Sequence, residues 1–180
     1  MYRELFSYPK NGPKEVLSEH TYSFTYKNAL FLMIDATSKD ELQTEWIRQQ
    51  LQDSDATWKF AMFHFPPYNW EIPYQNIQKL WVPLFDQYHV DMVFSGHIHY
   101  YMRSNPMRAG QLVESFADGT AYIVSIGIPY GPTPIGHEPY AAVTKEEGQF
   151  YQHIKIDGNT LTYKAIDSHD QEIDNFSITK

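Results

Sequence analysis

The sequence predicts an α/β fold built on a mixed sheet, and three observations carry this prediction. Three runs of strand length are almost entirely apolar, at residues 29–35, 59–65 and 90–95. Apolar residues at helical spacing lie between these runs, and after residue 100 the chain changes to short strand-like segments. Strand–helix–strand order predicts right-handed crossovers and parallel pairing, whereas short alternating segments predict antiparallel strands.

The first elements are two predicted strands joined by a tight turn. Residues 21–26 alternate and are rich in threonine and aromatic side chains, which is typical of a strand. Lys27 and Asn28 form a predicted tight turn into residues 29–35, where nearly every side chain is apolar. Continuous apolarity predicts a strand buried on both faces, as in the interior of an α/β sheet.

The first long helix is predicted from a start signal and a stripe. Ser38 and Glu41 have the spacing of a capping box, which places the helix start there. Apolar residues then repeat at helical spacing and predict the buried face: Leu42, Trp46, Ile47 and Leu51. The second buried strand, 59–65, follows, and the pair Pro66-Pro67 ends it.

A second helical stripe separates this strand from the third one. Its members recur at helical spacing: Ile77, Leu80, Trp81, Leu84, Phe85 and Tyr88. Pro83 lacks the N–H that a helix interior requires, so we expect a helix to begin or kink near Trp81. The third buried strand, 90–95, runs directly into Gly96.

The last third of the chain predicts strands at 121–126, 151–156 and 161–166. The dipeptide Asp157-Gly158 between the last two is a strong signal for a two-residue hairpin turn.

Residues 127–136 are dense in glycine and proline and predict a shaped surface loop. We expect residues 1–180 to form one unit, with an α/β part at 1–99 and a mainly antiparallel part at 100–180.

Composition excludes several classes of protein. The 180 residues are 42% hydrophobic and 16% aromatic, which argues against disorder. Fourteen Lys and Arg against 22 Asp and Glu give a net charge of −8 without a basic block, so we expect no nucleic-acid-binding surface. Cysteine is absent, so a metal ion would need imidazole and oxygen ligands.

Membrane and secretion signals are also missing from the sequence. The longest apolar run, 29–34, is too short to cross a bilayer, which needs about 20 residues, so we expect no membrane partner. Residues 1–11 lack the apolar segment of a secretion signal.

Histidines follow two of the predicted strands. His64 lies at the end of one strand, and Gly96 leads from the next into His97 and His99. Because ligands bind at the carboxyl ends of parallel strands, we expect these imidazoles to meet at one edge. Imidazole is a common ligand for zinc, iron and manganese, so the histidines predict a metal site. A histidine alone at a strand end is more often a packed core residue, and the combination carries the argument.

Three further residues complete the candidate site. Asp35 ends the first buried strand, where we expect it to support the ligands rather than bind an ion. Tyr68 and Asn69, just beyond His64, are candidates for a substrate-binding rim. We predict no role for His20, which has no converging partner in the sequence.

At these residues the chain resembles the calcineurin-like metallophosphoesterase superfamily, and most closely its purple acid phosphatase-like branch. The matching stretches include WKFAMFHFPPY, VDMVFSGHIHYYMRS and DGTAYIVSIG, and the resemblance spans roughly residues 21–127. It implies one half of a four-layer αββα sandwich and a phosphoric-ester hydrolase of the EC 3.1 type. It also implies two metal ions (Fe, Zn or Mn), with His64 and His97 on one, His99 on the other, and Arg103 as support for the loop.

The sequence departs from the family pattern at two places. The family's earlier ligand motifs (Asp-x-His, Gly-Asp and Gly-Asn-His) occur nowhere in these residues, so we expect the general acid and the bridging carboxylate upstream. The paired histidines that follow the His64 motif in plant-type purple acid phosphatases are replaced by Trp70-Glu71-Ile72-Pro73-Tyr74. We therefore expect the chain alone to bind metal weakly and to hydrolyse little or nothing.

Two alternatives remain open. The chain is either part of a phosphate-ester hydrolase or a truncated or degenerate domain with a structural or binding role; a mononuclear three-histidine zinc hydrolase is a weaker possibility. A missing lobe would leave apolar surface that favours self-association. An extracytoplasmic location is compatible with the resemblance.

Overall fold

The computed structural model describes residues 2–71, 74–128, 131, 134 and 136–180. Its centre is a seven-stranded sheet in the order β1-β2-β3-β4-β8-β5-β9. The strands of this sheet are β1 (Tyr22–Tyr26), β2 (Ala29–Met33), β3 (Trp58–Met62), β4 (Met92–Ser95), β5 (Tyr101–Ser104), β8 (Ala121–Val124) and β9 (Ala141–Lys145). The helices are α1 (Tyr2–Leu5), α2 (Asp40–Gln52), α3 (Gln75–Leu80) and α4 (Val82–Tyr88).

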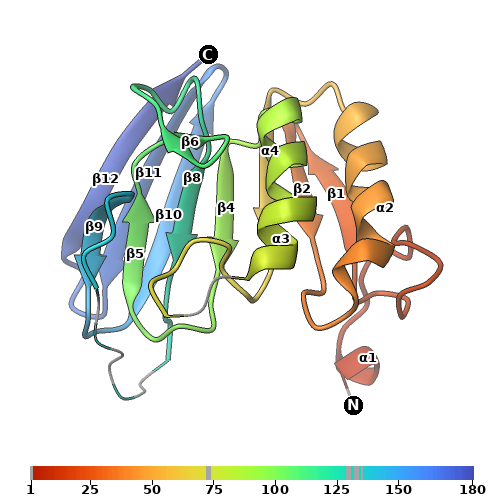
Figure 1. The fold of residues 1–180 in the computed structure, drawn as a ribbon, viewed down its shortest axis with the longest axis horizontal. Coiled ribbons are helices and arrows are strands. Elements are labelled where there is room, and N and C mark those ends of the chain that lie inside the picture. Colours follow the sequence, from red (N-terminus) through yellow and green to blue (C-terminus); the bar gives the residue numbers. More distant parts are fainter. Residues whose placement is uncertain (1, 72–73, 129–130, 132–133, 135) are drawn as a thin grey trace.

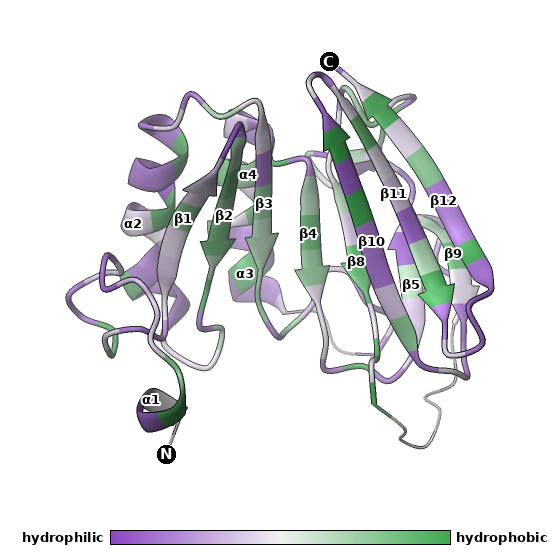
Figure 2. Ribbon diagram, turned by 180° about the vertical axis from the view of Figure 1, so that it is seen from behind, coloured by the Kyte–Doolittle hydropathy of each residue, from purple (hydrophilic) through white to green (hydrophobic). Residues whose placement is uncertain are grey.

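The layers are helices, large sheet and small sheet. Figure 1 shows α2, α3 and α4 on one face of the large sheet. A three-stranded antiparallel sheet of β10 (Phe150–Asp157), β11 (Thr160–Asp167) and β12 (Glu172–Thr179) covers part of the other face (Figure 2). A short hairpin of β6 (Met107–Arg108) and β7 (Gln111–Leu112) completes the elements. This α/β/β arrangement confirms the predicted fold class, a mixed sheet with antiparallel C-terminal strands.

The pairing corrects one part of the topology. Strands β2, β3 and β4 are parallel, as the two helical crossovers predict, and β1 is antiparallel to β2. Strand β8, which we expected among the antiparallel strands, pairs parallel with β4. The intervening residues 96–120 are long enough to return the chain to the starting edge, which parallel pairing requires. The seven-stranded sheet therefore continues across the boundary that we placed at residue 99.

Each face of the large sheet has its own core. Between the sheet and the helices, completely or nearly completely buried side chains include Leu32, Ile47, Leu51, Trp81, Phe85 and Val93. Between the two sheets, the buried set includes Trp58, Phe60, Tyr101, Leu161, Tyr163 and Ile178. Strands β2, β3 and β4 contribute to both cores, which explains why they lack a polar face in the sequence.

The start of α2 differs from the prediction. The helix begins at Asp40 with Lys39 at the N-cap position and no side-chain cap, and the Ser38 hydroxyl donates to the Asp35 carboxylate at 2.8 Å. Leu42 is also exposed, and Gln43 takes the buried position on this turn. Gln43 is buried because it accepts a hydrogen bond from the Thr21 hydroxyl and donates one to the Asp35 carbonyl.

The second helical stripe is divided as predicted. Helix α3 ends at Leu80, Trp81 is buried at the junction, and α4 begins at Val82 with Pro83 in its first turn. The predicted hairpin at Asp157-Gly158 joins β10 and β11, with Gly158 in the left-handed region. Five positions in the predicted loop 127–136, namely 129, 130, 132, 133 and 135, lie outside the described residues.

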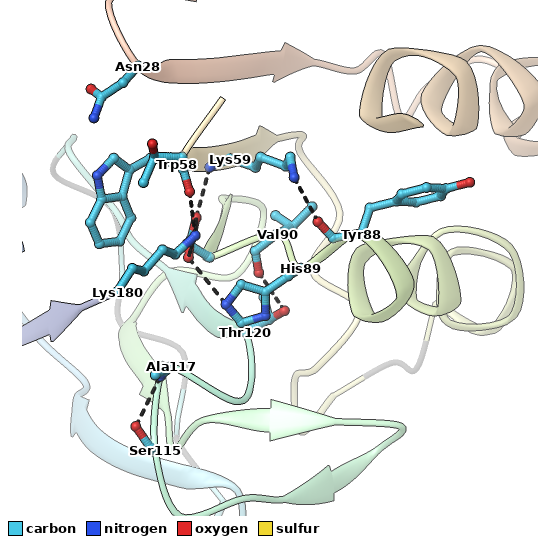
Figure 3. Close-up of polar contacts among 12 residues, drawn as sticks. Asn28, Trp58, Lys59, Tyr88, His89, Val90, Ser115, Ala117, Thr120 and Lys180 are labelled. Carbon is cyan, nitrogen blue, oxygen red and sulfur yellow. Dashed lines mark hydrogen bonds and ion pairs between the residues drawn. The ribbon is translucent and has the colours of Figure 1, made fainter. Parts of the chain in front are cut away.

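A polar cluster joins the two sheets at the amino ends of the parallel strands (Figure 3). The Lys180 ammonium lies 2.7 Å from the fully buried Asp91 carboxylate and also donates to the Thr57 carbonyl. The same ammonium lies over the Trp58 ring, 4.7 Å from its centroid. Burial raises the pKa of Asp91, and the Lys180 contacts oppose that shift. The cluster fixes the end of β12 against β3.

A second polar contact between the sheets involves Arg103, to which the resemblance assigned a supporting role. Its guanidinium makes a bidentate pair with Asp174 of β12, at 2.6 and 2.9 Å, and the side chains are 10% and 3% exposed. The Phe116 and Phe176 rings flank the guanidinium, with centroids 5.6 and 5.0 Å away. Arg103 therefore supports the packing of the small sheet.

We predict that Arg103→Met lowers the free energy of unfolding by about 3–5 kcal/mol, because it leaves the buried Asp174 charge without its partner. Urea denaturation followed by circular dichroism measures this loss. Lys164→Met is the matched control, since Lys164 forms an exposed pair with Glu172 on β11 and β12. Equal losses in the two variants would show that the buried pair carries no special weight.

The pH dependence of stability provides a second test. Partial burial, with a smaller effect of Glu41, raises the pKa of Asp40 from 3.8 to about 6. Between pH 4 and 6 the folded state therefore binds more protons at this site than the unfolded state, so this contribution to stability falls as pH rises. We predict that Asp40→Asn removes that contribution. The difference in unfolding midpoint between variant and wild type should grow from pH 4 to pH 6 in favour of the variant, and a constant difference would contradict the prediction.

Candidate functional site

Three candidate residues occupy equivalent places at one edge of the large sheet. Asp35, His64 and His97 each lie two residues beyond the last residue of a strand. These last residues are Met33 of β2, Met62 of β3 and Ser95 of β4. These strands are parallel and adjacent, so their carboxyl ends meet at the same edge. Strands β2 and β3 end earlier than the predicted residues 35 and 65, whereas β4 ends at residue 95 as predicted. Both histidines therefore belong to loops.

His64 and His97 lie directly against each other. The Nδ1 atom of His97 is 3.2 Å from the Nε2 atom of His64, and the ring centroids are 5.1 Å apart with the planes 78° apart. Both residues are exposed. The structure therefore brings together two of the three histidines that the sequence singled out, as neighbours with facing ring nitrogens.

The surroundings of His64 favour its neutral form. Its pKa is lowered from the ordinary value of 6.5, first by partial burial and then by repulsion from His97 and His99. A neutral imidazole has a lone pair available for a metal ion, whereas a protonated one does not. The arrangement thus favours the form of His64 that can bind a cation.

The backbone at His97 adopts an uncommon conformation. The φ angle is +68°, and the Ile98 amide donates to the Gly96 carbonyl at 2.8 Å, so His97 is the central residue of a γ-turn in the left-handed region. Residues other than glycine rarely adopt such angles, and strain of this kind concentrates at functional sites. Gly96 lies beside His64, since a Cβ there would make an ordinary contact with the His64 ring, 3.4 Å from its Nδ1 atom.

Two aromatic rings also contact the His97 imidazole. The Phe65 ring lies 4.8 Å away at 77°, and the Tyr74 ring lies 5.8 Å away at 80°. These two rings stack on each other with centroids 4.9 Å apart. Neither residue was predicted to belong to the site, since Phe65 falls in a predicted strand and Tyr74 in the segment that departs from the family pattern.

Asp35 is part of a polar network at the same edge. Its carboxylate accepts hydrogen bonds from the Thr37 hydroxyl and amide and from the Ser38 hydroxyl. His20 Nδ1 is 3.4 Å from the same carboxylate. Partial burial alone would raise the pKa of Asp35, but these hydrogen bonds outweigh it and lower the pKa. Asp35 is thus ionised and already engaged with its own loop.

The expectation that His20 has no converging partner was wrong. His20 and His64 line the same open cavity of about 480 Å3, together with Ser95, Gly96 and Ser125. The antiparallel β1–β2 hairpin brings the residues before β1 next to the end of β2. Recognising that Thr21–Tyr26 pairs antiparallel with β2 would have placed His20 beside Asp35.

The other predicted site residues have different surroundings. His99 is half-buried, and repulsion from it is one of the causes that lower the pKa of His64. Asn69 is buried, with its amide bonded to the Pro66 carbonyl and to the Glu71 amide. Tyr68 packs against Tyr122, with ring centroids 4.6 Å apart. These contacts belong to loop and core packing, and a substrate-binding role for Tyr68 and Asn69 stays a prediction.

The three histidines do not form a three-ligand cluster. Within the described part of the chain, no group of three or more His, Asp or Glu side chains is placed to hold one ion. The mononuclear three-histidine alternative therefore has no cluster to support it. None of the described helices is long and apolar enough to span a membrane.

Comparison with known proteins identifies the family. The model of the calcineurin-like phosphoesterase family matches residues 5–101, more than half of the chain, and the chain belongs to this family. This confirms the resemblance seen in the sequence. Members of the family are phosphoesterases, and purple acid phosphatases generally use dinuclear metal centres.

Sequence relatives point to the purple acid phosphatase-like branch. Purple acid phosphatase 23 of Arabidopsis thaliana is 34% identical over 94 residues, which are 47% of this chain and 20% of that protein. An uncharacterized protein of Mycobacterium tuberculosis is 31% identical over 105 residues, or 54% of this chain and 20% of the relative. The matched region thus spans about one fifth of the length of each of these relatives.

Solved structures share the fold along nearly the whole chain. Purple acid phosphatase PPD1 from yellow lupin (Lupinus luteus) seeds has a TM-score of 0.77 at 18% identity, covering 99% of this chain and 35% of that one. PhoD has a TM-score of 0.67 at 14% identity, covering 99% of this chain and 46% of that one. These similarities establish the metallophosphoesterase fold.

Proposed function

We propose that this chain supplies the histidine side of a dinuclear metal centre in a phosphoric-ester hydrolase. The observation that carries the proposal is the His64–His97 pair at the carboxyl edge of a metallophosphoesterase sheet. In this proposal the complete centre includes ligands from sequence outside these 180 residues.

The spacing of the two ring nitrogens fits a shared metal ion. Two nitrogens bound to one zinc ion at about 2.0–2.1 Å lie about 3.3 Å apart at the tetrahedral angle and about 2.9 Å apart at a right angle. The observed 3.2 Å between His64 Nε2 and His97 Nδ1 lies between these limits. The distance between the two nitrogens therefore fits a shared ion, and in its absence an N–H of one ring donates to the other.

The second ion would use His99, and the two ions need an anion between them. Ions about 3.5–4 Å apart repel each other strongly, and neutral imidazoles offer no compensating charge. Asp35 is the nearest candidate carboxylate, but its oxygens already bind Thr37, Ser38 and His20. Asp91 lies at the amino end of β4 and pairs with Lys180. A bridging carboxylate therefore comes from outside the chain, as the family motifs imply.

The substrate in this proposal is a phosphate ester. When bound, iron, zinc or manganese ions supply Lewis-acid activation of the phosphoryl group and of water. The residues of this chain hold and orient the ions through His64, His97 and His99. The chain has a net charge of −8, so positive charge at the site comes from the ions rather than from Lys or Arg.

A non-catalytic role is the second candidate. Two observations favour it: the Asp35 carboxylate is engaged within its own loop, and Trp70–Tyr74 replaces the paired histidines of plant-type purple acid phosphatases. In that case the chain retains the fold and acts as a structural or binding domain.

Ion binding and hydrolysis separate the two candidates. We predict that the chain binds Co²⁺ weakly, with a dissociation constant measured by calorimetry, and that His64→Ala abolishes this binding. His169→Ala, at an exposed turn residue, is the control. Adding an upstream segment with the family's aspartate motifs should then give hydrolysis of p-nitrophenyl phosphate or its bis ester. No hydrolysis of either ester with both parts present would favour the non-catalytic role.

We also propose that a second copy of the isolated chain binds the uncovered face of β1 and β2, where Figure 2 shows no covering strand. Phe24, Phe31 and Phe60 form a stacked row with centroids 4.8 and 5.1 Å apart, which leads from this face into the core between the sheets, where Phe60 is buried. Phe24 is 41% exposed and Tyr26 is 65% exposed. Apolar rings left in water are a driving force for association.

Sedimentation velocity over a range of concentrations tests this association. We predict concentration-dependent dimerisation of the wild type, and a monomeric Phe24→Lys variant, because a charge within the row opposes burial. Leu112→Lys, at a similarly exposed apolar residue on β7, is the matched control. A wild type that stays monomeric throughout would contradict the proposal.

A further inference from the structure

The His97 side chain is contacted by residues from other segments of the chain. Its backbone occupies the left-handed region at φ +68°, and the residue is exposed. Three rings contact the imidazole: His64, Phe65 and Tyr74. The last two come from different segments, one directly after His64 and the other directly before α3.

The two aromatic contacts of the His97 imidazole have similar, well-defined geometries. Both aromatic rings meet the imidazole nearly at right angles, at 77° and 80°, and they stack on each other with 24° between their planes. Edge-to-face contacts of this kind are favourable because the positive ring edge meets the negative face. The two stacked rings thus form one wall, which we call the Phe65–Tyr74 wall.

The wall contacts a residue whose backbone conformation is strained. A non-glycine residue at the centre of a left-handed γ-turn is strained, and it keeps that conformation only if its surroundings stabilise it. At His97 the surroundings are the Ile98–Gly96 hydrogen bond, the His64 ring and the wall. The bond to Gly96 fixes the backbone, whereas the side-chain torsions are restrained by the contact with His64 Nε2 and by the neighbouring rings.

We propose that Phe65 and Tyr74 are positioning residues for His97: their stacked rings hold the imidazole so that its Nδ1 faces His64 Nε2. This inference rests on the proposed function, because the paired nitrogens matter only if they share an ion. It gives a role to Tyr74, which stands where the sequence departs from the family pattern. The wall touches His97 and not the ion, so it acts through the ligand.

Preorganising a ligand lowers the entropy that must be lost when an ion binds. An imidazole free to rotate would have its Nδ1 beside His64 for only part of the time. Residues that orient metal ligands typically change metal affinity by about 10–100-fold when they are removed. The wall is a nonpolar counterpart of the hydrogen bonds that usually orient such ligands.

The experiment compares Tyr74→Leu with Tyr74→Phe. Leucine removes the stacked ring, whereas phenylalanine keeps the ring and removes only the hydroxyl. Phe24→Leu is the matched control, since it removes a ring from a similar stack on the far face of the sheet. Two measurements are made on each variant: nuclear Overhauser contacts between the His64 and His97 ring protons without metal, and the dissociation constant for Co²⁺.

We expect Tyr74→Leu to weaken the inter-ring contacts and to reduce Co²⁺ affinity about tenfold or more. Tyr74→Phe and Phe24→Leu should match the wild type in both measurements. Unchanged inter-ring contacts and affinity in Tyr74→Leu would overturn the proposal. If Tyr74→Leu unfolds, Phe65→Leu takes its place under the same criteria.

The two measurements also separate this inference from the proposed function. A wild type that does not bind Co²⁺ would count against the metal centre, and therefore against a role of the wall in orienting a metal ligand. Inter-ring contacts that persist without the wall would count against the positioning role even if Co²⁺ binds normally. Loss of both in Tyr74→Leu alone supports the proposal.

The strain at the turn has its own readout. His97→Gly and His97→Ala both remove the imidazole, but only glycine adopts φ +68° without a steric cost. We expect the glycine variant to unfold at the higher temperature of the two. A glycine variant no more stable than the alanine variant would remove the premise that the turn needs external support.

Discussion

The site depends on the register of three parallel strands. Met33 of β2 pairs with Met62 of β3, and Met62 pairs with Phe94 of β4, so the strands end almost level. Side chains alternate between the faces of a strand, and a shift of one residue would exchange both cores and carry the loops to new positions. The two hydrophobic cores fix this register, because a shifted strand would place its apolar side chains against the wrong neighbours. Packing far from the histidines therefore determines that His64 and His97 meet.

The elements that carry strong periodic signals could be predicted from the sequence. The buried strands, the helix break near Trp81 and the Asp157-Gly158 hairpin all follow from apolar runs, a missing amide and turn chemistry. The parallel pairing of β8 could not be predicted, since a short apolar strand has the same pattern in either direction. The predicted capping box did not form for a tertiary reason: the Ser38 hydroxyl is oriented toward the Asp35 carboxylate, to which it donates, and Lys39 takes the N-cap position of α2. Local motifs hold only where no charged partner competes for the same side chain.

The candidate site also contains residues that the sequence predicts and residues that depend on tertiary contacts. Strand order placed His64 and His97 at one edge, and the sequence needed nothing more than the rule for parallel sheets to bring them together. His20 and Tyr74 lay outside that reasoning, because neither follows the carboxyl end of a parallel strand, and each reaches the site through a contact that this rule does not describe. The left-handed angle at His97 has no signature in residue type, since glycine precedes it and would be the usual choice for such a turn. Surroundings, rather than local propensity, decide these features.

The cluster around Lys180 has a consequence for how the chain reaches its native state. Lys180 meets the Thr57 carbonyl across 123 positions, and the Trp58 indole meets the Gly158 carbonyl across 100. Contacts of such long range close large loops, and topologies rich in them fold slowly. The contacts of Lys180 need both β3 and the small sheet in place, so their formation depends on the closure of these large loops. Thr57 and Trp58 are synthesised long before Lys180, so the partners on β3 are available before the ammonium that anchors to them.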